Sequence, residues 1–204
     1  DIQFADKLGY TIKLLGIIKQ QPKSSKGGAR VQVSVYPTLV PNQHLLASVN
    51  QVFNAVFVRG DVVGDTLFYG RGAGKDATAS AVLSDIADAA LELKHQTRDR
   101  IPPFVPHESK GTVVPLDETT SQYYLRLSVE DRPGVMAKIA NVLGQAKIGI
   151  ASIIQPEARE GESVPLILMI HDARNDAMKK ALARIAKLKV VKAPPVMIRV
   201  ESFA

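Results

Sequence analysis

The sequence predicts an α+β protein in which a mixed α/β segment is followed by a ferredoxin-like βαββαβ domain. Three observations support this fold class. A mostly polar stretch at about residues 94–122, centred on a Pro-rich run at 102–106, separates two segments. Before it, short apolar runs alternate with turn residues; after it, strand and helix patterns alternate regularly. We therefore expect one domain over residues 1–116 and a second over residues 120–204.

The first segment opens with two predicted strands. The run at 12–18 is short and rich in β-branched and apolar residues, and the run at 31–36 alternates strictly, which puts Val31, Val33 and Val35 on one face. Residues 22–29, rich in Ser, Lys and Gly, predict a turn between them. A short helix at 44–52 and strands at 53–58 and 66–69, joined by a turn at Gly60-Asp61, are expected next.

A helix at residues 77–93 completes the first segment. Its apolar residues recur mostly at three- and four-residue steps: Ala79, Val82, Leu83, Ile86, Ala90 and Leu93. This spacing forms one stripe along a helix, so we expect the helix to have one buried face.

The second segment repeats a simple order of elements. Strict alternation of apolar residues predicts strands at 125–129, 166–170 and 196–200, and a continuous apolar run predicts another at 148–154. Amphipathic spacing predicts helices at 135–143 and 178–188. The resulting βαββαβ order predicts an antiparallel four-stranded sheet with both helices on one face.

Composition excludes several classes of function. The chain has no Cys, which removes disulfides, thiolate nucleophiles and Cys-ligated zinc, and its four His residues show no spacing that would gather a metal. No apolar run approaches the roughly 20 residues that a membrane span requires. We therefore expect a cytoplasmic protein that binds neither a metal nor a membrane. Because the chain begins at Asp1 without Met or an export segment, we expect a piece of a longer protein.

The net charge of +6 and the pI of about 9.5 raise the alternative of a nucleic-acid-binding protein. The basic residues are scattered, however, between a Gly/Ser-rich loop and the length of the second predicted helix of the βαββαβ segment. They are not interleaved with aromatic residues, as a groove for single strands would require. We therefore favour solvated basic faces and expect no nucleic-acid partner.

The turn at 131–135, Asp-Arg-Pro-Gly-Val, is the first candidate site. Pro133 suits the first turn of a helix, and Gly134 allows a ligand to approach the backbone. Amide hydrogens and the positive dipole end at this helix start would attract a carboxylate, and Asp131 could accept hydrogen bonds from an ammonium group. Such a site suits a free amino acid. From these residues alone, an ordinary helix start with an acidic cap is the favoured interpretation.

The glycine turn at 70–74, Gly-Arg-Gly-Ala-Gly, is the second candidate, because it lies between a strand and a helix. Three glycines permit a close backbone approach, so contact with a phosphate or cofactor is possible. The spacing of the glycines differs from that of the dinucleotide-binding fingerprint. In addition, no strand that ends in an acidic residue follows about twenty residues later. On chemistry alone, a structural turn is favoured.

The second segment resembles an ACT domain, because it combines the βαββαβ order with Asp-Arg-Pro-Gly-Val in the first connection. In that family two copies usually associate, and an amino acid binds where the first connection of one copy meets the second strand of the other. The resemblance implies a regulatory ligand that touches six residues: Asp131, Gly134, Val135, Ala151, Ser152 and Ile153.

Several ordered segments together resemble homoserine dehydrogenase. They are FADKLGYTIKLL at 4–15, HLLASVN at 44–50, NAVFV at 54–58, GRGAG at 70–74 and TASAV at 78–82. The resemblance implies the C-terminal part of an enzyme that uses NAD or NADP to reduce aspartate 4-semialdehyde to homoserine. In that family the nucleotide-binding domain and the catalytic Lys and Asp belong to a segment upstream of Asp1. We therefore expect no catalytic residue in this chain and no activity from the piece alone.

The glycine turn keeps a role under this resemblance, because in the family it lies near the nicotinamide end of the cofactor. Gly72 and Gly74 are therefore expected to contact NAD or NADP. One departure concerns Lys75-Asp76-Ala77, where relatives commonly have Pro before the Thr, and it leaves the detailed shape of the turn open.

Two hypotheses for the function follow. In the first, the chain is part of a homoserine dehydrogenase that forms a homodimer or homotetramer and is regulated by an amino acid, with threonine favoured as the end product of the pathway. In the second, the chain is a non-catalytic dimeric amino-acid-binding module that signals to a partner. The gene sequence upstream of Asp1 would distinguish the two hypotheses.

Overall fold

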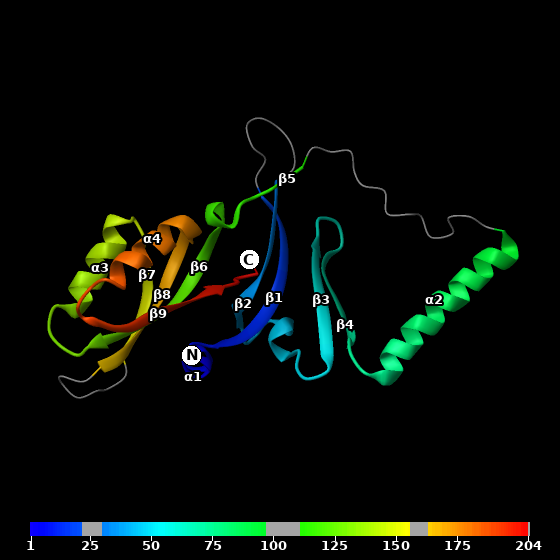
Figure 1. Ribbon diagram of the computed structural model, residues 1–204, viewed down its shortest axis with the longest axis horizontal. Helices are drawn as coiled ribbons and strands as arrows, with labels where there is room; N and C mark the ends of the chain where they lie inside the picture. Colours follow the sequence, from blue (N-terminus) through cyan, green and yellow to red (C-terminus); the bar gives the residue numbers. More distant parts are fainter. Residues whose placement is uncertain (22–29, 97–110, 156–162, 204) are drawn as a thin grey trace. The chain divides into compact units, whose positions relative to one another are not determined.

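The computed structural model describes residues 1–21, 30–96, 111–155 and 163–203 (Figure 1). The turn expected at 22–29 and the Pro-rich run at 102–106 lie outside these residues. The chain forms two compact units: unit 1 consists of residues Asp1–Gln43 and Ser109–Ala204, and unit 2 of residues His44–Glu108.

Unit 1 is built on a seven-stranded sheet. Its strands are β1 (Tyr10–Gln21), β2 (Arg30–Pro41), β5 (Thr112–Val113), β6 (Thr120–Glu130), β7 (Ile150–Ile154), β8 (Ser163–Arg174) and β9 (Val191–Val200). Its helices are α1 (Ile2–Lys7), the 3-10 turn η2 (Leu116–Glu118), α3 (Val135–Gln145) and α4 (Asn175–Ile185). The strand order is β1-β2-β9-β6-β8-β7, and the short β5 pairs with β2.

The predicted βαββαβ order is confirmed by the run β6-α3-β7-β8-α4-β9. Within this run the neighbouring strands β9-β6-β8-β7 are all antiparallel, and α3 and α4 lie on the same face of the sheet (Figure 1). Alternation along β6 directs Tyr123, Leu125, Leu127 and Val129 into the core beneath these helices. The main core of unit 1 therefore holds the turn between β6 and α3 in a fixed position.

The sheet is larger than the four strands that the sequence predicts. The end of β2 pairs in parallel with the end of β9, where Leu39 lies opposite Val200, and β1 pairs with β2. On the face opposite α3 and α4, Leu39 and Val200 pack with Tyr124 and with Ala5 of α1 in a second small core. Unit 1 thus contains residues on both sides of the domain boundary expected between residues 116 and 120. A linear pattern does not show this pairing, because the strands are about 160 residues apart in sequence.

A buried arginine lies at the seam between β2 and β9. The Arg199 side chain is 7% exposed and forms no ion pair with a carboxylate of the described residues. Its guanidinium stacks over the rings of Tyr36 and Tyr123, at 4.6 and 5.5 Å from their centroids. It donates hydrogen bonds to Asn175 Oδ1 at 2.7 Å and to Thr119 Oγ1 at 3.3 Å. These contacts join β2, β6, β9 and the start of α4. They compensate for the hydration that the guanidinium loses when it is buried.

Unit 2 contains the 3-10 turn η1 (Leu45–Ser48), the antiparallel strands β3 (Phe53–Gly60) and β4 (Gly64–Arg71), and the helix α2 (Lys75–His95). These elements confirm the expected short helix, strand pair and long helix in their order. The expectation that the helix has a buried face is wrong, because α2 buries none of its residues; Leu83 is 65% exposed and Leu93 is 81% exposed. The spacing identifies an apolar stripe, but the described residues supply no surface that covers it.

Candidate functional site

The turn between β6 and α3 has the backbone that its sequence predicts. Gly134 is the N-cap of α3 and adopts a φ of +84°, which residues with a Cβ rarely do. A Cβ at this position would meet no atom within 4 Å, so the glycine is needed for its conformation and not for lack of space. No side chain caps α3. The expectation of an ordinary acidic cap at Asp131 is therefore wrong.

A cavity of about 510 Å³ opens beside this turn. Its apolar lining comes from Val129 of β6, Val135 and Met136 of α3 and Leu166 of β8. The turn itself and the side chains of Glu130, Asp131, Arg132 and Gln155 supply the remaining lining. A small hollow at a helix start, lined by both apolar and polar groups, is typical of a site for a small polar molecule.

The polar groups of the cavity are arranged in two sets. Glu130 pairs with Lys192 of β9, and Arg132 Nε lies 2.7 Å from Glu130 Oε2, although this contact lacks the direction of a hydrogen bond. The hydrogen bond from Lys192, with the nearby charge of Arg132, lowers the pKa of Glu130 below its ordinary value. In the second set, Gln155 Nε2 donates a hydrogen bond of 3.0 Å to Asp131 Oδ1.

Of the six residues expected to touch a regulatory ligand, three line this cavity: Asp131, Gly134 and Val135. The other three, Ala151, Ser152 and Ile153, are exposed on β7, the outermost strand at one end of the sheet. The structure does not bring these three residues to the cavity of the same chain. Among the described residues β7 pairs only with β8, so its other edge is open to another strand.

Sequence reasoning missed Gln155, Glu130 and Lys192 as neighbours of the turn. Gln155 directly follows the strand that was predicted to end at residue 154, so its position at a strand end was visible. The pairing of β7 and β6 with the same strand, β8, brings Gln155 near Asp131, and no local pattern contains that information.

The glycine turn in unit 2 joins β4 to α2. Gly72 donates its amide to Val52 O, and a Cβ on Gly72 would lie 1.4 Å from Asn54 Nδ2. Packing within the chain therefore explains the glycine at position 72. Gly74 is the N-cap of α2 with a φ of +127°, and a Cβ there would meet nothing within 4 Å.

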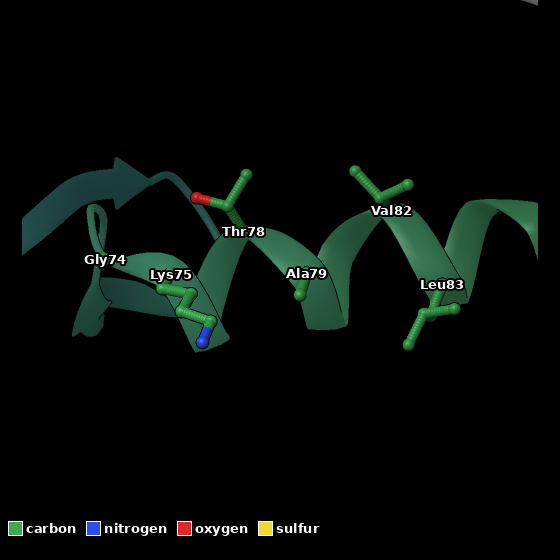
Figure 2. Close-up of a pocket in the computed structure, with 6 residues that line it drawn as sticks. All are labelled: Gly74, Lys75, Thr78, Ala79, Val82 and Leu83. Atoms are coloured by element: carbon green, nitrogen blue, oxygen red, sulfur yellow. The ribbon is translucent and has the colours of Figure 1, made fainter.

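A shallow hollow of about 740 Å³ lies beside the start of α2, and Figure 2 shows the residues that line it. Gly74 lies in the turn, and Lys75, Thr78, Ala79, Val82 and Leu83 project from the helix (Figure 2). Gly72 does not line it. The lining comes from one helix and the residue before it, which is too little to enclose a nucleotide.

The described residues contain no group of three or more His, Asp or Glu side chains that could hold a metal ion. None of their helices combines the length and apolarity needed to pass through a lipid bilayer.

Family comparisons match both halves of the chain. Residues 1–87 match the family described as homoserine dehydrogenase, and residues 123–190 match the ACT domain family. Among curated proteins, the chain is 42% identical to a homoserine dehydrogenase of Neisseria gonorrhoeae and 40% identical to one of Pseudomonas aeruginosa. Both alignments cover 100% of this chain and 46% of the relative, so the chain spans about half the length of these relatives.

Solved structures agree with these matches. A homoserine dehydrogenase from Thiobacillus denitrificans superimposes with a TM-score of 0.86 at 36% identity, over 100% of this chain and 45% of that one. A homoserine dehydrogenase of S. aureus gives a TM-score of 0.58 at 29% identity, over 99% of this chain and 44% of that one. This chain is thus similar to part of a larger protein.

Proposed function

Because the chain belongs to the homoserine dehydrogenase family and carries an ACT domain, we propose that it is the C-terminal part of an NAD- or NADP-dependent homoserine dehydrogenase. The whole enzyme would interconvert L-homoserine and L-aspartate 4-semialdehyde in the cytoplasm. Its nucleotide-binding domain and its catalytic Lys and Asp would belong to residues that precede Asp1. The role of this chain would be to complete the subunit and to regulate it.

The cavity beside Asp131 is the observation that carries the regulatory part of this proposal. It offers an uncapped helix start for a carboxylate and an aspartate for an ammonium, at opposite ends of one short turn. Its apolar wall would receive a small side chain. A free amino acid combines these three features, and we propose threonine, the end product of the pathway, as the effector.

A second copy of the chain would complete the regulatory site. The open edge of β7 supports this part of the proposal, because Ala151, Ser152 and Ile153 are exposed there and do not line the cavity of their own chain. Binding between two copies would favour one state of a homodimer or homotetramer over another. Sedimentation at several concentrations, with and without threonine, measures this association.

The fit of the glycine turn to a nicotinamide cofactor is limited. Gly74 leaves its backbone approachable, with Lys75 and the start of α2 beside it. The contact of Gly72 with Asn54 accounts for that glycine without a ligand. We propose that Gly74 touches the edge of NAD or NADP in the whole enzyme, that Gly72 shapes the turn, and that other residues of the enzyme hold the cofactor.

Two measurements test the proposal. The protein encoded by the whole gene should oxidise homoserine with NAD or NADP, and the 204-residue chain alone should not. Calorimetry on the chain with threonine, methionine and isoleucine should give heat with threonine, and no heat from any of the three would refute the regulatory role. If the gene begins just before Asp1, the second hypothesis, a non-catalytic amino-acid-binding module, replaces the first.

A further inference from the structure

The strands β1 and β2 form a ribbon that is longer than its backbone contact with β9. Among the described residues, β2 pairs with β9 only at Thr38 and Leu39, and the amide of Glu201 extends this contact by donating to Leu39 O. The middle of the ribbon, comprising residues 15–19 of β1 and 32–36 of β2, lies beyond these positions. Within the described part of the chain, it forms no backbone hydrogen bond with the strands β6–β9.

The middle of the ribbon has little core of its own. Ile17 and Gln32 are buried, whereas Ile18, Val33 and Val35 are exposed on the opposite face. A pair of strands without further packing is at best marginally stable in water. Residues outside the ribbon therefore determine how firmly its middle is held. One such contact is made by β5, which pairs with the end of β2 that is farthest from β9.

Two side chains from the end of β9 reach the middle of the ribbon. Arg199 and Glu201 are 7% and 8% exposed, and because they are two residues apart they project to the same side. The guanidinium of Arg199 stacks over the ring of Tyr36 in β2, at 4.6 Å from its centroid, and Glu201 pairs with Lys19 of β1. In the register of the ribbon, Tyr36 and Lys19 lie on one face and beyond the backbone contact with β9.

The other contacts of Arg199 lie within the ACT domain and its approach. Its guanidinium stacks over Tyr123 of β6 and donates hydrogen bonds to Asn175, at the start of α4, and to Thr119. One buried cation is thus shared between a ring of the ribbon and a ring of the ACT sheet. A movement of the ribbon away from β9 would separate Tyr36 from the guanidinium and leave a buried charge with fewer partners, which is costly.

We propose that Arg199, assisted by Glu201, couples the middle of the β1–β2 ribbon to the ACT domain, so that a ligand that stabilises the ACT domain also stabilises the ribbon. The effect of the ligand rests on the proposed regulatory function. A ligand that binds only the folded form stabilises the segments that unfold together with its site. The ribbon lies within residues 1–87, which match the homoserine dehydrogenase family, so this coupling carries the effect of an amino acid into the enzyme part.

Native-state hydrogen exchange on the full 204-residue chain tests the coupling with the variant Tyr36→Leu. This change removes the ring on which Arg199 stacks from the ribbon side and leaves the contacts of Arg199 in the ACT domain in place. Without ligand, the variant should speed the exchange of the amides of residues 32–36 at least about tenfold more than that of Leu125 and Leu168 in the ACT core. Protection retained at Leu125 and Leu168 shows that the variant is folded.

Threonine provides the second arm of the experiment. At about 100 times its Kd, threonine should slow the exchange of residues 32–36 at least about tenfold in the wild-type chain, because the ribbon opens together with the ACT domain. In Tyr36→Leu the same concentration should slow these amides by less than about twofold. The amides of Leu125 and Leu168 should be slowed to a similar extent in both chains.

Two control variants isolate the contact with the ring. Tyr36→Phe keeps the ring and removes only the hydroxyl that accepts a hydrogen bond from Gln32, so it should behave like wild type in both arms. Val35→Leu replaces a β-branched residue of the same strand at a position that is 70% exposed on the opposite face, so it reports the effect of strand propensity alone. Its effect on residues 32–36 should be less than about threefold.

The outcomes separate the coupling from the regulatory function. Equal acceleration of the ribbon and of the ACT core in Tyr36→Leu would overturn the coupling, as would an equally large effect of Val35→Leu. Threonine that slows exchange in the ACT core of the wild-type chain but not at residues 32–36 would also overturn it, and would leave amino-acid binding standing. If threonine slows neither set of amides and gives no heat, threonine regulation fails, and the comparison without ligand still decides whether Arg199 holds the ribbon.

Discussion

Replacing Arg199 with Met should destabilise unit 1, because this side chain connects both sides of the β2–β9 seam. The variant loses two cation–π contacts, at about 0.5–2 kcal/mol each. It also loses a charge-assisted hydrogen bond to Asn175, at about 1.5–3 kcal/mol. Methionine avoids the cost of burying a guanidinium, which offsets part of this loss. We expect a net decrease of about 2–3 kcal/mol in the free energy of unfolding.

Urea denaturation followed by tyrosine fluorescence measures this change. The chain has no Trp, and four of its five Tyr residues lie in unit 1: Tyr10, Tyr36, Tyr123 and Tyr124. The matched control is Arg184→Met on the exposed face of α4, which should change the free energy of unfolding by less than about 0.5 kcal/mol. If Arg199→Met unfolds at the same urea concentration as the control, or at a higher one, the buried cation does not stabilise the seam.

Three further predictions address individual residues. Asp131→Asn should weaken threonine binding at least about tenfold in calorimetry, because the proposed site uses this carboxylate to accept from the ligand. The free energy of unfolding should stay within about 0.5 kcal/mol of wild type, since the side chain does not cap α3; unchanged affinity would refute the proposed contact. Gly72→Ala should destabilise unit 2, because the added Cβ would collide with the side chain of Asn54. Adding Asn54→Ala should recover part of the lost free energy of unfolding. A double variant that is no more stable than Gly72→Ala would contradict the contact. The pKa of Glu130 is lowered in the folded chain, so its contribution to stability is present above the ordinary value of 4.5 and is lost as the pH falls through the folded pKa. Glu130→Gln should therefore be less stable than wild type near pH 7, and the difference in the free energy of unfolding should shrink in acid. Urea titrations at several pH values measure this difference, and a difference that does not change with pH would argue against the pairing.

The second half of the fold was predictable because each of its elements has a strong local pattern. Alternation at Leu125, Leu127 and Val129 identifies a strand with one buried face, and the structure buries all three residues beneath α3 and α4. The Pro-Gly pair at 133–134 marks the helix start, and the positive φ of Gly134 follows from the same residues. The local sequence pattern was sufficient to predict an element wherever its packing partners were close in sequence.

Predictions failed where the partner was distant in sequence or outside the described residues. The stripe at Val82, Leu83 and Ile86 has the spacing of a buried helix face, yet these residues are exposed. Periodicity reports that a face is apolar, and it carries no information about what lies against it. The extension of the sheet by β2 was missed for a related reason, since Leu39 and Val200 belong to different halves of the chain.

The candidate site was predicted in part. Asp131, Gly134 and Val135 could be chosen because a helix start has a known chemistry for anions and ammonium groups. Gln155 could not be chosen, because its only local signal is a polar residue after a strand, and such residues are common. Its contact with Asp131 depends on the order of strands in the sheet, which becomes visible only in three dimensions.

The parallel pairing of Leu39 with Val200 has a practical consequence for anyone who wishes to excise or transplant the ACT domain. A cut between residues 116 and 120 follows the linear organisation, but it would remove the end of β2 that pairs with Arg199 and Val200 of β9, and it would expose the residues that pack against Leu39 to water. An unprotected strand margin of this kind invites self-association. An isolated version of the domain would therefore need a replacement for this end of β2, or polar substitutions at the exposed end of β9.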